Sequence, residues 1–208
     1  MRNGFRTPAA AGLLGAAAVA GAAIWWRRNP SPCPYYQRFF VELPHPAITR
    51  SRLREVLQPR DGERILEIGP GTGYYALPVA GWLAPHGTLE LCDIQQKMLD
   101  HTLERAAERG LSNIIATRGD AQALPYDNGR FDAAYITVAL GEIPDPDAAL
   151  RELRRVLKPG GRLVVGEILL DPHVVRLAAL RERCEAVGLR FERHVGGWVG
   201  YFARFTPA

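Results

Sequence analysis

The stretch LEIGPGTGYYALPVA, residues 66–80, holds the residues whose types and spacing most clearly suggest chemistry. Gly69, Gly71 and Gly73 follow a short apolar run, and Glu67 stands two residues before the first of them. Glycine reaches backbone conformations closed to other residues and lets the main chain approach a ligand. A helix that begins after such a turn favours an anion, whereas the carboxylate favours a cation. The pattern therefore predicts a nucleotide-type ligand, and Glu67 makes a pyrophosphate a poor match.

Two further acids follow at the expected ends of strands. The spacing G-x-G-x-G differs from the dinucleotide fingerprint G-x-G-x-x-G. Asp93 ends a second apolar run about 20 residues beyond the turn, where a carboxylate would accept from both ribose hydroxyls. Asp120 lies just past a third run, in position to accept from an adenine amine. A single loop acid is often only solvated charge, but three acids at strand ends indicate one binding site.

Apolar periodicities alternate from Ala47 onward in the manner of a βαβ protein. We expect strands over 64–69, 87–94, 113–119, 131–140 and 162–170, and two more across a turn at Gly196–Gly197, within 190–205. We expect helices over 47–57, 74–83 (kinked at Pro78), 95–110, 145–161 and 171–189. The predicted fold class is α/β, a doubly wound and mostly parallel sheet whose closing hairpin places one strand antiparallel.

Residues 1–28 form a hydrophobic segment outside the globular domain. Residues 8–26 carry no charge, and as a helix they would extend roughly 28 Å, close to the thickness of a bilayer's hydrocarbon core. Trp25 and Trp26 beside an arginine pair match the aromatic anchors at the end of a membrane span. We therefore expect a membrane anchor; a cleaved secretory signal and an interfacial or disordered tail are the alternatives.

Residues 29–46 join this segment to the domain at 47–208. Three prolines make the first part stiff. Aromatic side chains follow at Tyr35, Tyr36, Phe39 and Phe40. The segment is either a short helix that covers the edge of the domain or a lid over a substrate pocket.

Composition excludes several classes of protein. The 208 residues carry a net charge of +4, with Lys97 and Lys158 as the only lysines. The arginines alternate with acids, as on solvated helix faces, so we expect no nucleic-acid partner. Cys33, Cys92 and Cys184 are scattered, which argues against a disulfide framework and a zinc site, and no cluster has metal-ligand spacing.

The motifs taken in order resemble a class I S-adenosylmethionine-dependent methyltransferase, in the branch of the menaquinone/ubiquinone-biosynthesis C-methyltransferases. The motifs are LEIGPGTG, LELCDI, RGDAQALP, FDAAYITVALGEIPD and LRELRRVLKPGGRLVV. The resemblance covers roughly residues 47–205. It implies a seven-stranded Rossmann-like sheet with an antiparallel penultimate strand, S-adenosylmethionine as cofactor and S-adenosylhomocysteine as product.

The resemblance also assigns roles to residues. Glu67 would orient the glycine turn and face the cofactor's amino group. The glycines and Thr137 would line the methionine portion, Asp93 would bind the ribose, and Asp120 with Ala121 would bind adenine. The implied cofactor contacts are Glu67, Gly69, Gly71, Gly73, Asp93, Ile94, Asp120, Ala121 and Thr137.

A general base is needed only if the methyl acceptor arrives protonated. Glu142 and His173 are the candidate catalytic residues, with Tyr75 and His45 less favoured. Many relatives carry a histidine pair where this chain has Gly141 and Glu142, so a base assigned to that histidine elsewhere does not carry over.

The aromatic residues and the hydrophobic segment together favour a small apolar or lipid-like acceptor. The cofactor then places the domain on the cytoplasmic side of a membrane, with a soluble cytoplasmic protein as the alternative. An NAD-dependent oxidoreductase and a non-catalytic, membrane-tethered nucleotide-binding protein are the competing functions. The sequence leaves the acceptor, the methylated atom and the oligomeric state open.

Overall fold

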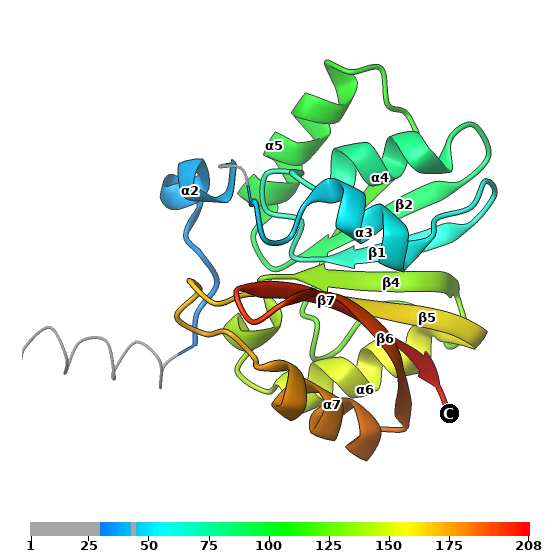
Figure 1. The fold of residues 1–208 in the computed structure, drawn as a ribbon. Helices are drawn as coiled ribbons and strands as arrows, with labels where there is room; N and C mark the ends of the chain where they lie inside the picture. Colours follow the sequence, from blue (N-terminus) through cyan, green and yellow to red (C-terminus); the bar gives the residue numbers. More distant parts are fainter. Residues whose placement is uncertain (1–29, 43–44) are drawn as a thin grey trace, which may run out of the picture.

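The computed structural model describes residues 30–42 and 45–208, which form a seven-stranded sheet with helices on both faces (Figure 1). The strands are β1 (Arg64–Ile68), β2 (Thr88–Asp93), β3 (Ile114–Arg118), β4 (Phe131–Thr137), β5 (Leu157–Ile168), β6 (Leu189–Gly197) and β7 (Gly200–Pro207). The helices are η1 (Tyr35–Gln37), α2 (Arg38–Glu42), α3 (Arg50–Leu57), α4 (Ala76–Leu83), α5 (Gln96–Ala107), η2 (Leu140–Glu142), α6 (Pro146–Val156) and α7 (Leu177–Ala186).

The strand order is β3-β2-β1-β4-β5-β7-β6. The first five strands pair in parallel, and β7 is antiparallel to both β5 and β6. Because β7 lies between β5 and β6, the antiparallel strand occupies the penultimate position in space. The predicted fold class and the predicted place of the antiparallel strand are therefore confirmed.

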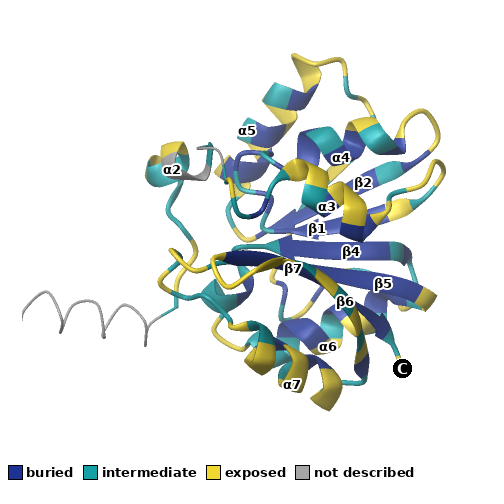
Figure 2. Cartoon of the chain, viewed as in Figure 1, coloured by how far each residue is buried: buried dark blue, intermediate teal, exposed yellow. Residues whose placement is uncertain are grey.

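Two apolar cores lie on opposite faces of the sheet. Alternation along β4 sends Ile136 to the core that contains α6 and α7, and Tyr135 to the core that contains α3, α4 and α5. Both side chains are fully buried. Figure 2 shows the central strands buried along their length and the exposed residues on the outer sides of the helices. The buried sheet fixes where each strand ends, and hence where the loops that carry the acids begin.

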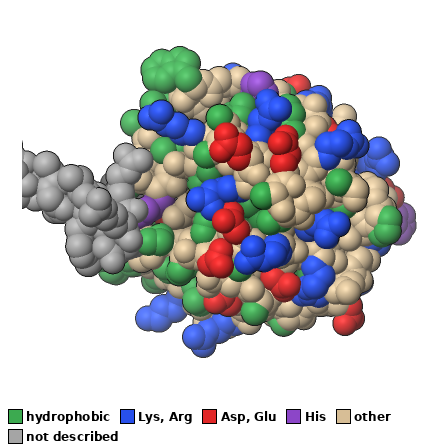
Figure 3. All heavy atoms as spheres, turned by 90° about the horizontal axis from the view of Figure 1, so that it is seen from below, with side chains coloured by type: hydrophobic (Ala, Val, Ile, Leu, Met, Phe, Trp, Pro, Cys, Tyr) green, Lys and Arg blue, Asp and Glu red, His purple; other side chains and the backbone are tan. Residues whose placement is uncertain are grey.

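Charged side chains are distributed over the helical face that contains α6 and α7. Figure 3, which views this face from below, shows basic and acidic side chains interspersed. Arg183, for example, pairs with Asp147 at 2.7 Å, and Arg155 pairs with Glu152 at 2.7 Å. This is the pattern of solvated helix faces that the sequence predicts.

The predicted helices begin later than expected, most clearly α7. Helix α4 begins at Ala76 instead of Tyr74, which places Pro78 in its first turn. The N–H groups of a first turn have no partner within the helix, so a proline there removes no helical hydrogen bond and requires no kink. The last helix was expected from Asp171, and that start is wrong, because α7 begins at Leu177. The N–H of His173 bonds to the Asp171 carboxylate (2.6 Å) and that of Val175 to the Glu167 carboxylate (3.3 Å), so neither is available to a helix.

None of the helices within 30–42 and 45–208 is long and apolar enough to cross a membrane. The whole segment 1–28, with the predicted anchor at 8–26, lies outside the described residues, so that prediction is not tested.

Candidate cofactor site

The glycine turn, residues 69–73, follows β1 and requires glycine at three positions. The φ angles of Gly69, Gly71 and Gly73 are 63°, 56° and 81°, which L side chains rarely adopt. A Cβ on Gly73 would also lie 2.9 Å from Cγ2 of Thr102. The N–H of Gly69 donates to the carbonyl of Cys92 (2.9 Å), which fastens the turn to β2. The three predicted glycines thus form one turn at the carboxyl edge of the sheet.

Helix α5 holds the glycine turn from behind. Thr102 Oγ1 donates to the carbonyl of Gly71 (3.0 Å), and Arg105 donates to the carbonyl of Thr72 (2.6 Å). Sequence reasoning missed both residues. Their three-residue spacing on the buried side of a helix after Asp93 is a signal that points to the turn, although it is a weak one.

Glu67 is buried at the end of β1, with 2 % of its surface exposed. The hydroxyl of Tyr135 donates to its Oε2 at 2.6 Å. Burial raises the pKa of Glu67 to about 8, an effect that the Tyr135 hydrogen bond opposes and the charge of Asp93 reinforces. The sequence predicted the position of Glu67 but gave no sign of Tyr135 as its partner.

Asp93 ends β2 beside the glycine turn. Its Oδ1 accepts the N–H of Gln95 at 2.8 Å, which holds the carboxylate in place. Burial raises the pKa of Asp93 to about 6, although main-chain hydrogen bonds oppose the effect. Ile94, the next residue, is 51 % exposed, so its side chain offers an apolar surface outside the carboxylate.

Asp120 and Ala121 follow β3, as expected. Asp120 is exposed and Ala121 is buried. The side-chain amide of Gln122 donates to both carboxylate oxygens of Asp120 at 3.0 Å, and the main-chain N–H of Gln122 donates to Oδ1 at 2.9 Å. A ligand amine would therefore share Asp120 with Gln122, which the sequence did not show.

The end of β4 supplies the wall opposite Asp93. Oγ1 of Thr137 is buried and has no hydrogen-bond partner within the described part of the chain. Val138 has a φ of 53°, an outlier for a β-branched residue, and its N–H donates to the carbonyl of Gly166 (2.8 Å). A Cβ on Gly69 would lie 3.1 Å from Cβ of Ala139, so the glycine turn closely approaches this wall.

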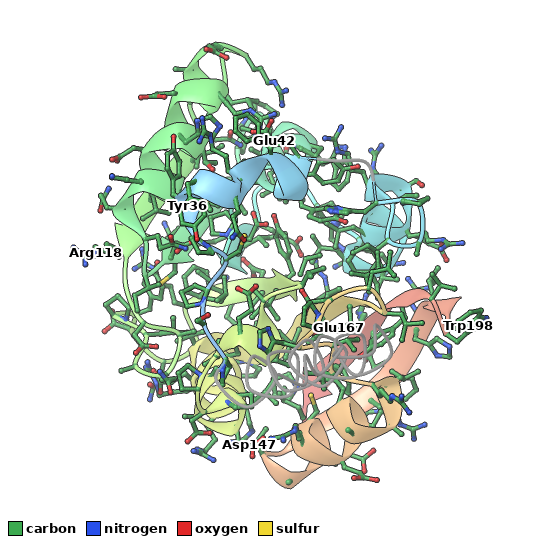
Figure 4. All side chains as sticks on the ribbon, turned by 90° about the vertical axis from the view of Figure 1, so that its left-hand side faces the viewer. Tyr36, Glu42, Arg118, Asp147, Glu167 and Trp198 are labelled. Atoms are coloured by element: carbon green, nitrogen blue, oxygen red, sulfur yellow. The ribbon has the colours of Figure 1, made fainter. Side chains whose placement is uncertain are left out.

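The segment 30–42 crosses the carboxyl edge of the sheet; we call it the strap. The N–H of Cys33 donates to Oε2 of Glu142 (3.1 Å), and the carbonyl of Cys33 accepts from the side chain of Gln95 (3.0 Å). Glu42 pairs with His101 and Arg105 of α5 at 3.3 and 3.5 Å. The strap therefore joins η2, after β4, to the start of α5, after β2. Figure 4 looks onto this edge, with Tyr36 and Glu42 on the strap.

Glu142 lies in η2 under the strap. Burial raises its pKa to about 7, the Cys33 hydrogen bond opposes the shift, and the charges of Asp171 and Asp93 add to it. Glu167, at the end of β5, is 2 % exposed, and its Oε1 has no partner among the described residues. Burial raises the pKa of Glu167 well above its usual value, and the charges of Asp171 and Glu142 add to that effect. Sequence reasoning missed Glu167, although an acid inside the apolar run VVGEILL is unusual enough to mark it.

The other candidate bases are His173, next to η2, and the pair Tyr75 and His45. His173 is in the loop after β5, and its carbonyl lies where a Cβ on Gly141 would project. The hydroxyl of Tyr75 donates to the carbonyl of Ile48 (2.6 Å) and lies 3.2 Å from Nδ1 of His45. Burial raises the pKa of Tyr75 and lowers that of His45. A tyrosine committed to a main-chain carbonyl in this way is poorly placed to act as a base.

Two open grooves flank the strap. One, of about 320 Å³, is lined by Tyr35, Ile94, Gln95, Gln96, Lys97 and Arg118. The other, of about 390 Å³, includes Pro30, Gly141, His173 and Arg176. Neither groove is lined by Glu67 or Asp93. Both carboxyl groups therefore lie deeper at the carboxyl edge of the sheet than these grooves.

The residues at this edge fit S-adenosylmethionine. Burial raises the pKa values of Glu67 and Asp93, and the charge of Asp93 adds to the effect at Glu67, so a ligand with a positive charge would stabilise their ionised forms. The Thr137 hydroxyl, which has no partner among the described residues, and the main chain of the glycine turn are left to meet such a ligand. Within 30–42 and 45–208 there is no group of three or more His, Cys, Asp or Glu side chains that could hold a metal ion.

Several known proteins are similar to this chain in sequence and in fold. The model of the ubiE/COQ5 methyltransferase family matches residues 43–176, which include the glycine turn and every acid discussed above except Glu42. The ubiquinone/menaquinone biosynthesis C-methyltransferase UbiE of Cellvibrio japonicus is 41 % identical over 115 residues, 55 % of this chain and 46 % of that protein. UbiE of Shewanella oneidensis is 36 % identical over 122 residues, 58 % of this chain and 49 % of that protein. The chain thus matches about half the length of these relatives.

Solved structures agree on the fold. A SAM-dependent methyltransferase from Aquifex aeolicus aligns with a TM-score of 0.76 and 19 % identity, over 83 % of this chain and 98 % of that one. The [4+2]-cyclase SpnF aligns with a TM-score of 0.64 and 31 % identity, over 70 % of this chain and 57 % of that one. The family match spans more than half of the chain and contains the turn and acids of the site. The chain belongs to the ubiE/COQ5 methyltransferase family.

Proposed function

We propose that this chain transfers a methyl group from S-adenosylmethionine to a carbon atom of a small, lipid-like hydroxyaromatic acceptor. The observation that carries the proposal is the family match over residues 43–176, which coincides with an edge of buried carboxylates suited to a cationic cofactor. The acceptor class follows the names of the relatives, which are C-methyltransferases of ubiquinone and menaquinone biosynthesis. None of the relatives described above supports an NAD-dependent oxidoreductase.

In this proposal the cofactor supplies an electrophilic methyl group on a sulfonium. Glu67 and the glycine turn hold its amino-acid portion, Asp93 accepts from its ribose hydroxyls, and Asp120 with Ala121 receives its adenine. The remaining task is to hold the acceptor in line and to exclude water. The strap over Gln95 and Glu142 serves that exclusion.

Carbon methylation of a hydroxyarene also requires the removal of one proton. The ring carbon attacks the methyl group, the S–CH₃ bond breaks as the C–CH₃ bond forms, and a proton must leave the acceptor. Glu142 is our proposed proton acceptor, because it lies in η2 directly after the β4 wall and its pKa of about 7 suits a base near neutral pH. His173 remains the second candidate.

Labelled cofactor offers a direct test. Purified full-length protein is incubated with methyl-labelled S-adenosylmethionine and a membrane-lipid extract, and the products are separated by solvent extraction and mass spectrometry. We expect the label in an apolar hydroxyaromatic product, and no product with Asp93→Ala. Label confined to a water-soluble product would contradict the acceptor class. Cofactor binding without transfer to any acceptor would contradict methyl transfer itself; the cyclase among the structural relatives makes product analysis necessary.

A further inference from the structure

Four large apolar side chains gather on two adjoining turns at the carboxyl edge of the sheet. Leu170 and Trp198 are each 84 % exposed, Val199 is 40 % exposed and Leu169 is 39 % exposed. The N–H of Leu169 donates to the carbonyl of Val199 at 2.8 Å, so the loop after β5 and the β6–β7 turn are held side by side. We call these four residues the hairpin patch.

The hairpin patch lies at the edge of the sheet where the described chain begins. β5 pairs with β7 up to Ile168 and Gly200, which places both turns at the carboxyl end of β5. Pro30 lines a groove with Gly141 and His173, which follow β4 and β5. Figure 1 shows these turns and the start of the described chain on its left-hand side, and Figure 4 shows Trp198 projecting from that edge.

The sequence of residues 1–29 indicates the kind of surface that the hairpin patch contacts. Twenty-nine residues precede Pro30, and residues 8–26 among them carry no charge and end in Trp25 and Trp26. The segment 193–200, RHVGGWVG, contains no acid, and Arg176 on the neighbouring loop is exposed. The acid on that loop, Asp171, is partly buried and accepts the N–H of His173. Tryptophan and leucine beside basic residues are typical of a surface that enters the headgroup region of a bilayer.

From these observations we propose that the hairpin patch docks on a lipid bilayer surface, with Trp198 and Leu170 inserted at the headgroup boundary. Both side chains are 84 % exposed, and a few side chains suffice for interfacial insertion. A specific protein interface needs about 800 Å² from each partner, which is far more than two turns supply. The proposal concerns residues 169–170 and 198–199 and does not depend on the methyl-transfer reaction.

Trp198 itself reports on the proposal. In the full chain with Trp25→Phe, Trp26→Phe and Trp82→Phe, Trp198 is the only tryptophan. Vesicles of phosphatidylcholine and phosphatidylglycerol with acyl chains brominated near the headgroup should quench its fluorescence and shift its emission to the blue. The matched control retains Trp82, which lies on α4 under Arg54, in place of Trp198 and should show neither change.

Flotation with the same vesicles completes the design. Leu170→Asp should lower partition onto vesicles by about tenfold or more, since burial of one leucine exceeds that factor. Ile115→Asp, at a site 48 % exposed on β3, should leave it unchanged. Vesicle-bound protein whose Trp198 stays unquenched would overturn the proposal, because residues 8–26 would then account for the binding. Failure of the protein to float with the vesicles would overturn the proposal as well. So would Trp198 fluorescence that is already blue-shifted without lipid, because residues 8–26 or a second copy of the chain would then cover the patch.

Discussion

The hydroxyl of Tyr135 on β4 donates a 2.6 Å hydrogen bond to Oε2 of Glu67 on β1, and the two residues are direct neighbours in the parallel ladder. Both are buried. A carboxylate in that setting depends on its donor, because without one its desolvation is uncompensated. The pair therefore links the stability of the sheet to the affinity of the cofactor site.

Tyr135→Phe is expected to weaken both properties. Loss of the donor should lower the free energy of unfolding by about 1–3 kcal/mol and raise the pKa of Glu67 further. Binding of S-adenosylhomocysteine should weaken, because Glu67 would more often be protonated. Urea unfolding and titration calorimetry measure the two effects. Tyr201→Phe removes a similar hydroxyl, which donates to the carbonyl of Val175 (2.5 Å), and should cost stability without weakening cofactor binding.

The stability of the ligand-free protein should fall as the pH rises from about 5 to about 8. The pKa values of Asp93, Glu142 and Glu67 are raised to about 6, 7 and 8, so the folded chain retains protons that the unfolded chain has released. Their contribution is fully present below the unfolded pKa values and is lost as the pH rises through the folded ones. Urea unfolding across this range checks the slope. Glu67→Gln should flatten it at the upper end; an unchanged slope would argue against the assignment.

Gly73→Ala should cost more stability than Gly62→Ala, although the two φ angles are nearly equal at 81° and 80°. A left-handed φ alone costs an alanine about 1–2 kcal/mol. A Cβ at position 62 has nothing within 4 Å, whereas one at position 73 would lie 2.9 Å from Thr102 Cγ2. The difference in unfolding free energy isolates the packing of the turn on α5. Only Gly73→Ala should also reduce affinity for S-adenosylhomocysteine, so equal affinities would remove the turn from the site.

Asp93→Asn should reduce affinity for S-adenosylhomocysteine by roughly 10- to 100-fold, the worth of hydrogen bonds to a charged acceptor. The amide oxygen can still accept the N–H of Gln95, so the loop should keep its shape. Calorimetry measures the affinity, and thermal unfolding confirms that the fold is intact. Unchanged affinity would refute the ribose assignment.

Glu142→Gln should lower kcat by roughly 100-fold or more and leave the KM for the cofactor nearly unchanged. The amide cannot take up a proton, although its oxygen can still accept from Cys33. The limb of the pH–rate profile near pH 7 should disappear with it. His173→Asn should change the rate little, because the proposal assigns the proton to Glu142 and His173 lines the adjacent groove. The reverse result would assign the base to His173.

Much of this architecture follows from local sequence. The glycine turn, Asp93 and Asp120 were predictable because each directly follows a strand-length apolar run, and parallel strands end at one edge. The role of Tyr135 was not predictable, because an aromatic residue inside a buried strand is expected to be part of the apolar core. Its hydrogen bond becomes evident only when its neighbour on the adjacent strand is known. Strand pairing between Glu67 and Tyr135 spans 68 residues of sequence, which periodicity does not reveal.

The loop after β5 shows a second limit. The run from Asp171 has helical composition, yet the carboxylates of Asp171 and Glu167 bind the N–H groups of His173 and Val175 and delay the helix to Leu177. The N–H of Val175 can bond either within a helix or to the side chain of Glu167, and the second choice exists only because β5 places Glu167 there. The strap is a similar case, since its attachment to Gln95 and Glu142 joins residues 62 and 109 positions apart.

Contact between Cys33 and Glu142 has a consequence for proton affinity. The N–H of Cys33 stabilises the ionised carboxylate and so lowers its pKa. Burial of the same carboxyl group is the larger effect, and it raises the pKa to about 7. A stretch of chain 109 residues upstream of Glu142 therefore helps to set how strongly the site holds a proton.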